Sequence, residues 1–176
     1  SIRLAPVGNY WNGAGFLNPG ETYLPAAGLA SWSFTGSTPT WVSGTQYTLN
    51  VRAKDAADNL SAVAAQTFTF DSSLSTTVIT LPASNAPQNS LSMISGTASD
   101  NAGIESVSVR VYNNVLTKYW DNAAKNFNNI DADFAWYVSS ATLSDWTVWN
   151  ATFSFTTDTT YQVEARSKDK AGNFDT

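Results

Sequence analysis

Two stretches of the chain carry almost the same sequence: Tyr47–Asn59 reads YTLNVRAKDAADN, and Tyr161–Asn173 reads YQVEARSKDKAGN. They lie 114 positions apart (161 − 47), and this spacing holds without a gap back to Tyr23 and Tyr137. Because fixed-period self-similarity is the signature of repeat architectures, the match predicts tandem copies of one supersecondary unit.

Side-chain character alternates within both stretches. In Tyr47–Lys54, every second residue from Tyr47 onward is apolar, and the residues between them are polar or charged. Tyr161–Lys168 repeats the pattern, with Ser167 at the last inward position. Since successive side chains of a strand point to opposite faces, the pattern predicts a half-buried β-strand in each copy. Further short strands between turn signals favour an all-β sandwich.

The copies are out of phase at their ends. Upstream the spacing shrinks to 109 positions between Tyr10-Trp11 and Tyr119-Trp120 (119 − 10), and to 107 between Ser1–Leu4 and Ser108–Val111 (108 − 1). The second copy also has a lead-in, from residue 76 to residue 107, that the first copy lacks.

The first copy in turn has a tail, residues 61–71, that the second copy lacks. The polar stretch Asp71–Ser75 is the best candidate for a linker between a strand that ends one repeat and a strand that opens the next. We therefore expect two domains, residues 1–71 and 72–176.

Composition narrows the function classes. The net charge is −5, only 13% of residues are charged, and 43% are hydrophobic, enough for packed cores. The nine basic residues form no patch, which argues against nucleic-acid binding. No apolar run approaches the roughly 20 residues of a membrane span, so membrane insertion is not expected. The uncharged polar surface favours an extracellular or cell-surface location, where the chain would hold together without disulfides because it has no cysteine.

A family resemblance rests on residues of both copies. In the second copy they are Gly96–Asn114, Tyr119-Trp120, Trp146 and Tyr161–Asn173, and in the first copy they are Ser1–Leu4, Tyr10-Trp11, Trp32 and Tyr47–Asn59. The pattern resembles the tandem bacterial Ig-like and fibronectin-type-III-like domains of large secreted and cell-surface proteins. The resemblance implies tandem Ig-like antiparallel β-sandwiches, in which Tyr47–Lys54 and Tyr161–Lys168 are the sixth strands. The first sandwich would lack its N-terminal strands, and the second would lack its last strand.

Catalysis is disfavoured. The sequence has no His and no Cys, which removes the commonest general base and the thiol nucleophile. The carboxylate pair Asp131 and Asp133 is better explained as a solvated turn than as an acid–base pair. We expect no enzymatic activity.

Calcium is the ligand that the sequence best supports. In an Ig-like sandwich, the loop between the second and third strands and the loop after the sixth strand share one pole. The oxygen-bearing residues expected there are Asp71, Asp100, Asn101, Asp169 and Asn173. Such oxygens suit a hard cation. The alternative is that these residues only close turns by bonding their own backbone.

Tryptophans divide into two groups. Those at repeated positions, together with the two strand-opening tyrosines, are expected to be core residues: Trp11 and Trp120, Trp32 and Trp146, Tyr47 and Tyr161. Trp41, Trp136 and Trp149 have no tryptophan at the matched position. A platform of these three rings would stack on a sugar, and the alternatives are a protein contact or local core.

Taken together, these features favour a structural or adhesive repeat module of an extracellular fibre, stalk or adhesin. Its expected partners are neighbouring repeats or identical subunits joined by strand pairing, with head-to-tail filaments as one outcome. The alternative is a carbohydrate-binding module attached to a secreted enzyme, with a glycan as its partner.

Overall fold

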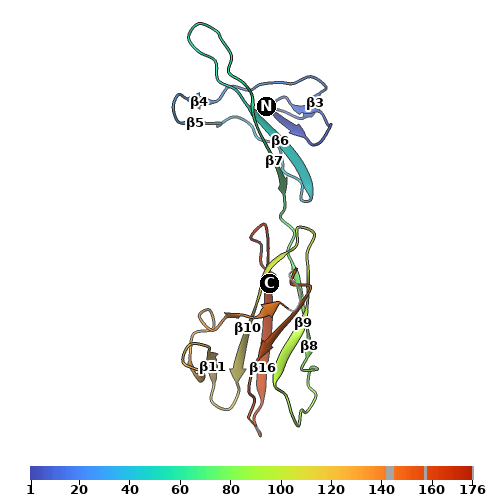
Figure 1. Cartoon of the computed structure of the whole chain (residues 1–176), viewed down its shortest axis with the longest axis vertical. Helices are drawn as coiled ribbons and strands as arrows, with labels where there is room; N and C mark the ends of the chain where they lie inside the picture. The colour runs from blue at the N-terminus through green and yellow to red at the C-terminus, as the bar shows by residue number, and fades with distance from the viewer. Residues whose placement is uncertain (142–144, 157, 176) are drawn as a thin grey trace. The chain divides into compact units, whose positions relative to one another are not determined.

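The computed structural model describes residues 1–141, 145–156 and 158–175 and consists of strands joined by turns and loops (Figure 1). It separates into two compact units, Ser1–Ser72 and Ser73–Thr176. Across the described ranges, the structure contains no helix that is long and apolar enough to cross a membrane. The all-β fold class predicted from the alternation is confirmed.

The first unit contains a five-stranded antiparallel sheet in the order β3-β2-β1-β6-β7 and a separate hairpin, β4-β5. Its strands are β1 (Ile2–Leu4), β2 (Tyr10–Trp11), β3 (Phe16–Asn18), β4 (Ala27–Gly28), β5 (Trp32–Ser33), β6 (Thr45–Val51) and β7 (Ala64–Phe70). The long strand β6 pairs with β1 along one edge and with β7 along the other. The buried core of this unit is small, because it rests on Ile2, Trp11 and Tyr47.

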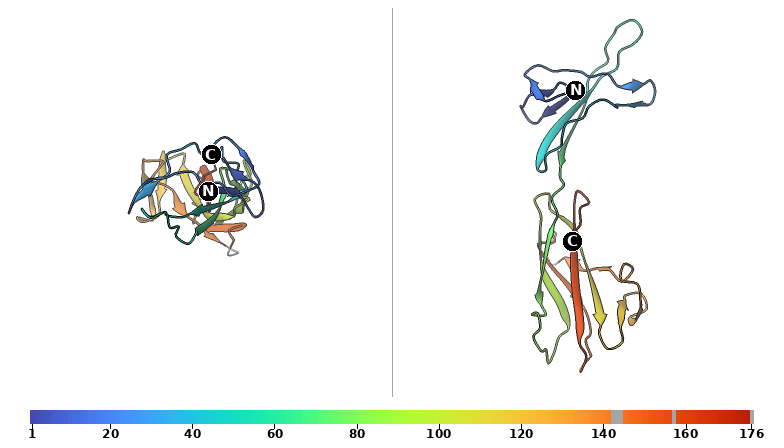
Figure 2. Two further views of the ribbon diagram at one scale, coloured as in Figure 1. Left: turned by 90° about the horizontal axis from the view of Figure 1, so that it is seen from above. Right: turned by 180° about the vertical axis from the view of Figure 1, so that it is seen from behind.

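The second unit contains two antiparallel sheets (Figure 2). In the first sheet, β10 pairs along its whole length with β16, and its other edge pairs with β13 and β11, which in turn pairs with β12. The second sheet has the order β14-β15-β9-β8. The strands are β8 (Thr76–Leu81), β9 (Met93–Ser99), β10 (Ile104–Asn113), β11 (Lys118–Asp121), β12 (Asn126–Asn129), β13 (Tyr137–Val138), β14 (Ser140–Ala141), β15 (Val148–Thr152) and β16 (Tyr161–Asp169).

Side chains from both sheets meet in the core of the second unit. Val107, Val109 and Val111 of β10 are fully buried, and they share one cluster with Trp149 of β15. Trp149 is 0% exposed and lies opposite Gly96 of β9. A Cβ atom at Gly96 would lie 2.5 Å from the indole ring, so the ring needs a glycine beneath it.

Both copies contain the same hydrogen-bonded corner before the matched strands. The Tyr47 hydroxyl accepts a hydrogen bond from the Val42 N–H at 3.0 Å, and the Tyr161 hydroxyl accepts one from the Thr156 N–H at 3.2 Å. A tyrosine at the start of a strand, bonded back to the chain a few residues upstream, is a hallmark of Ig-type sandwiches. The corner fixes where the chain crosses from one layer to the other.

The packing of aromatic rings is also repeated between the two units. Each unit has a Trp–Phe–Tyr cluster, formed by Trp11, Phe16 and Tyr47 in the first and by Trp120, Phe127 and Tyr161 in the second. The Trp–Phe centroids are 5.4 Å apart in the first unit and 5.3 Å in the second. The Phe–Tyr centroids are 5.8 Å and 5.7 Å apart. The 109-position match of the Tyr-Trp pairs is therefore structural as well as sequential.

The match of Ser1–Leu4 with Ser108–Val111 is wrong by two residues. Ile2 pairs with Leu49, and Val111 pairs with Val163, the residue that corresponds to Leu49. Ile2 therefore corresponds to Val111, at the same 109-position spacing as Tyr10 and Tyr119 (111 − 2). A shift of two keeps every side chain on the same face of the sheet, so the sequence pattern cannot detect it.

The prediction that Trp32 is a core residue is also wrong. Trp32 is 51% exposed, whereas Trp146 at the matched position is partly buried against the second core. In the second unit, β8 and β9 provide a second sheet over the core. Among the described residues of the first unit, no strand corresponds to β8 or β9, so nothing equivalent covers Trp32.

We expect Trp149→Ala to lower the free energy of unfolding of the second unit by about 3–5 kcal/mol, because it empties a fully enclosed ring site. Trp32→Ala, the control, should change the stability of the first unit by less than about 1 kcal/mol, since half of its ring is already in water. Urea denaturation followed by circular dichroism measures both. Equal losses in the two variants would contradict the assigned core.

Candidate functional site

The loop after each matched strand is closed by one Asp–Asn pair. In the second unit, the Asn173 backbone N–H and side-chain amide donate to the two carboxylate oxygens of Asp169 at 2.8 and 2.9 Å. In the first unit, Asn59 donates to Asp55 in the same way, at 2.9 Å for both bonds. These hydrogen bonds hold the pKa of Asp55 below its usual value, with the Asn59 side chain as the largest cause. The repeated D-x-x-x-N motif is thus a turn-closing device.

The two pairs differ in their surroundings. Asp55 is exposed, whereas Asp169 is completely buried. The loop after β16 meets the loop after β9, where the Lys170 N–H donates to the Gly103 carbonyl at 2.9 Å. One carboxylate oxygen of Asp169 and one of Asp100 lie within 4.8 Å of each other. The second unit therefore brings two of the predicted calcium ligands together, next to the Asn173 amide.

The remaining predicted ligands are placed as follows. Asn101 follows Asp100 in the same loop, and Asp100 accepts a hydrogen bond from the Ala102 N–H at 2.7 Å. Asp71 lies at the end of the first unit, where one of its oxygens accepts a hydrogen bond from the Ser43 hydroxyl at 2.7 Å. Each carboxylate oxygen has a second lone pair, and the donor set is all oxygen, which fits calcium. Calcium binding stays a prediction.

The three unmatched tryptophans do not form a sugar platform. Trp149 is enclosed in the core, so its prediction as a contact residue is wrong. Trp41 belongs to the first unit and packs edge-on to Tyr47, with ring centroids 4.8 Å apart. Its counterpart in the second unit is Phe155, 5.1 Å from Tyr161. Trp41 therefore occupies a repeated aromatic site that is not restricted to tryptophan, which explains why matching by tryptophan missed it.

Comparison with protein families gives the decisive assignment. The family described as Bacterial Ig-like domain matches residues 20–72 and 74–176. The chain belongs to this family. Searches of the curated proteins and of the solved structures found no match. Bacterial Ig-like domains are generally non-catalytic, are common on extracellular proteins, and suggest a structural or surface module.

The second Ig-like repeat carries a feature that the sequence analysis missed. On the outer face of β10 and β16, two guanidinium groups lie close to the Trp136 ring, with Arg110 Cζ 4.5 Å and Arg166 Cζ 4.3 Å from its centroid. Tyr119 and Phe174 lie beyond the two arginines, at 5.4 and 5.1 Å. Stacks of this kind are stabilised by cation–π attraction. The sequence signal that could have revealed this cluster is the outward position of both arginines in their strands.

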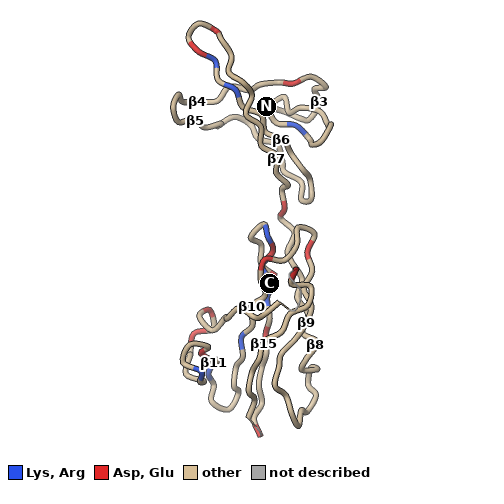
Figure 3. The backbone as a smooth tube through the Cα atoms, viewed as in Figure 1, with Lys and Arg blue, Asp and Glu red and all other residues tan. Residues whose placement is uncertain are grey.

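Glu164 completes this stack of arginines and rings. Its carboxylate accepts a hydrogen bond from Arg110, which is the largest cause of the raised pKa of that guanidinium. Charge is otherwise sparse along the Ig-like chain (Figure 3). Glu164 pairs with Arg110, whereas Arg166 contacts the rings of Trp136 and Phe174, so two positive groups and one negative group share this outer face.

The calcium hypothesis predicts that millimolar calcium raises the melting temperature of the second unit relative to chelator, because an ion would offset the repulsion between Asp100 and Asp169. Asp100→Asn should abolish the increase. The matched control, Asp55→Asn in the first unit, should leave it unchanged. Calorimetry with calcium and with chelator measures the effect, and a melting temperature that is the same in both would rule out calcium at this pole.

Proposed function

We propose that this chain is a structural and adhesive module of an extracellular surface fibre, stalk or adhesin. The observation that carries the proposal is the presence of two tandem copies of one Ig-like unit in a single chain. In the first copy the long strand β6 has neighbours on both edges, and in the second copy β8 and β9 open a new sandwich. This is the pattern expected of repeats that follow one another along a fibre.

Composition supports the same role. An outer surface rich in Ser, Thr and Asn with 13% charged residues suits an exposed spacer that must stay folded without disulfides. The sequence supplies neither His nor Cys for catalysis, so we propose that the module is not an enzyme. Head-to-tail addition of such units would give filaments.

The carbohydrate-binding alternative has lost its main support. It needed an exposed plane of rings from Trp41, Trp136 and Trp149. Trp149 is enclosed, Trp41 packs in an aromatic cluster, and two arginine guanidinium groups already lie close to the Trp136 ring. We therefore propose only the structural and adhesive role.

Antibodies raised against the folded chain should label intact cells that carry the natural protein, because the proposed module lies outside the cell envelope. An intracellular protein of the same cells serves as the control for leakage. The purified chain should also compete with cell attachment to a surface, and heat-unfolded chain should not. Labelling that requires permeabilised cells would contradict the extracellular location. Labelling without competition would leave a structural role and remove the adhesive one.

A further inference from the structure

The turn of the β2–β3 hairpin begins with the dipeptide Asn12-Gly13. Residues 12–15 form this turn, between Trp11 and Phe16, which pair across the hairpin. The 176-residue sequence contains no other Asn-Gly dipeptide. In such a dipeptide the backbone nitrogen of the glycine can attack the side-chain amide of the asparagine, because the attack closes a five-membered ring. The glycine has no Cβ, and its nitrogen is therefore accessible.

The described structure leaves the reacting groups unobstructed. Gly13 has a φ of +97°, and a Cβ built at this position has no heavy atom within 4 Å. Among the described residues, neither the Gly13 N–H nor the Asn12 Nδ2 amide donates a hydrogen bond. The nucleophile and the leaving group are thus both free. Both residues are also partly exposed to water, which the second step of the reaction needs.

The side-chain oxygen of Asn12 is held by two backbone donors. It accepts hydrogen bonds from the Ala14 N–H and the Gly15 N–H, both at 2.9 Å. Two N–H groups aimed at one carbonyl oxygen stabilise the negative charge that develops on it when a nucleophile adds to the carbonyl carbon. The turn therefore activates Cγ, the carbon that the Gly13 nitrogen attacks.

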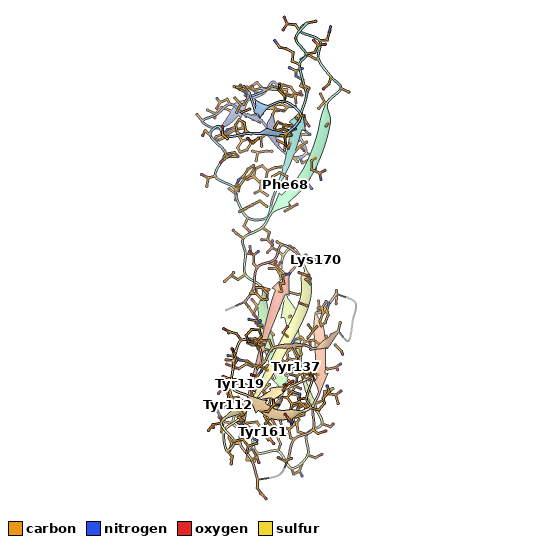
Figure 4. The ribbon with its side chains drawn as sticks, turned by 90° about the vertical axis from the view of Figure 1, so that its left-hand side faces the viewer. Phe68, Tyr112, Tyr119, Tyr137, Tyr161 and Lys170 are labelled. Atoms are coloured by element: carbon orange, nitrogen blue, oxygen red, sulfur yellow. The ribbon has the colours of Figure 1, made fainter. Side chains whose placement is uncertain are left out.

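The corresponding loop of the second unit already has an aspartate at this position. Asp121 matches Asn12 at the 109-position spacing (121 − 12) and ends β11, the strand that carries Tyr119 (Figure 4). Its Oδ1 accepts hydrogen bonds from the Ala123 and Ala124 N–H groups at 2.8 and 2.9 Å. The residues two and three positions downstream are the donors in both loops, so a carboxylate forms this turn as well as a carboxamide does.

We propose that Asn12 is a site of spontaneous deamidation, and that its aspartate product keeps the fold of the hairpin. The Gly13 nitrogen bonds to Asn12 Cγ, the Cγ–Nδ2 bond breaks, and the amide group leaves as ammonia with the proton of the Gly13 N–H. Water then opens the resulting succinimide ring. Cleavage of the Cγ–N bond gives aspartate, and cleavage of the other ring C–N bond gives isoaspartate. No oxidant or reductant is needed.

The two products differ in their effect on the first unit. Aspartate adds one negative charge to the net charge of −5 and leaves the backbone path unchanged. Isoaspartate also inserts one carbon into the backbone next to Trp11, which belongs to the small buried core with Ile2 and Tyr47. Isoaspartate should therefore lower the melting temperature of the first unit, whereas aspartate should not. This inference goes beyond the proposed function and does not depend on where the chain is located.

The test incubates the folded 176-residue chain at mildly alkaline pH, where the Gly13 N–H loses its proton more readily. Peptide mapping by mass spectrometry follows each asparagine, and an isoaspartyl methyltransferase labels the isoaspartate product. Asn12 should react at least about tenfold faster than Asn122, the matched control, which lies in the corresponding loop but precedes Ala123. Ammonia should be released in proportion to the loss of Asn12. The variant Asn12→Asp supplies the aspartate product in pure form and should melt at the temperature of the unreacted chain.

Three results would overturn the proposal. The first is an Asn12 that stays intact in the folded chain but reacts after unfolding in urea, because the fold would then protect it. The second is a reaction at Asn12 that is no faster than the reaction at Asn122. The third is a clearly lower melting temperature of the first unit in Asn12→Asp, which would show that a carboxylate does not keep this turn. Surface labelling of intact cells is independent of all three, so failure here is distinguishable from failure of the proposed function.

Discussion

The tyrosine at the start of the long strand makes the interaction on which each unit depends. Its ring must be covered by aromatic neighbours, and its hydroxyl must find a donor, because an unpartnered hydroxyl inside a core destabilises the fold. Tyr47 is buried and Tyr161 is partly buried, and the hydroxyl of each accepts from a backbone N–H five residues upstream. Each ring packs on a phenylalanine that in turn packs on a tryptophan. The crossing of the chain between layers, the register of the strand and the position of the following loop are set from this point.

The two units differ in the strands that cover their cores. In the second unit, the sheet β14-β15-β9-β8 covers the valines of β10, and Trp149 fills the space between the sheets. The first unit has only the hairpin β4-β5 in place of that sheet, and Trp32 and Leu29 are exposed on it. Among the described residues, the same repeat therefore forms two sheets in the second unit and one sheet with a hairpin in the first.

Alternation, turn residues and the self-match predicted the fold class, because they are local properties of strands and loops. Burial of particular residues depends on what packs over them, and this is not local. Trp32 was expected inside because Trp146 matched it, yet the covering strands exist in one unit only. For Trp149, which nothing matched, the sequence left a sugar platform, a protein contact and local core open, and the structure places its ring in the core over Gly96. The match of Ile2 was wrong by two residues because a shift of two leaves the alternation of inward and outward side chains unchanged.

The D-x-x-x-N motif shows how one local device acquires different roles in different surroundings. Its hydrogen bonds are the same in both units, so turn closure alone is sufficient to explain the recurrence of the sequence. Only in the second unit is the aspartate withdrawn from water and placed close to another carboxylate. Two carboxylates at that distance repel unless a proton, a cation or a hydrogen-bond donor intervenes. The Asn173 backbone N–H and side-chain amide donate to Asp169, and the Ala102 N–H donates to Asp100, so a cation at this pole would act only on the repulsion that these hydrogen bonds leave.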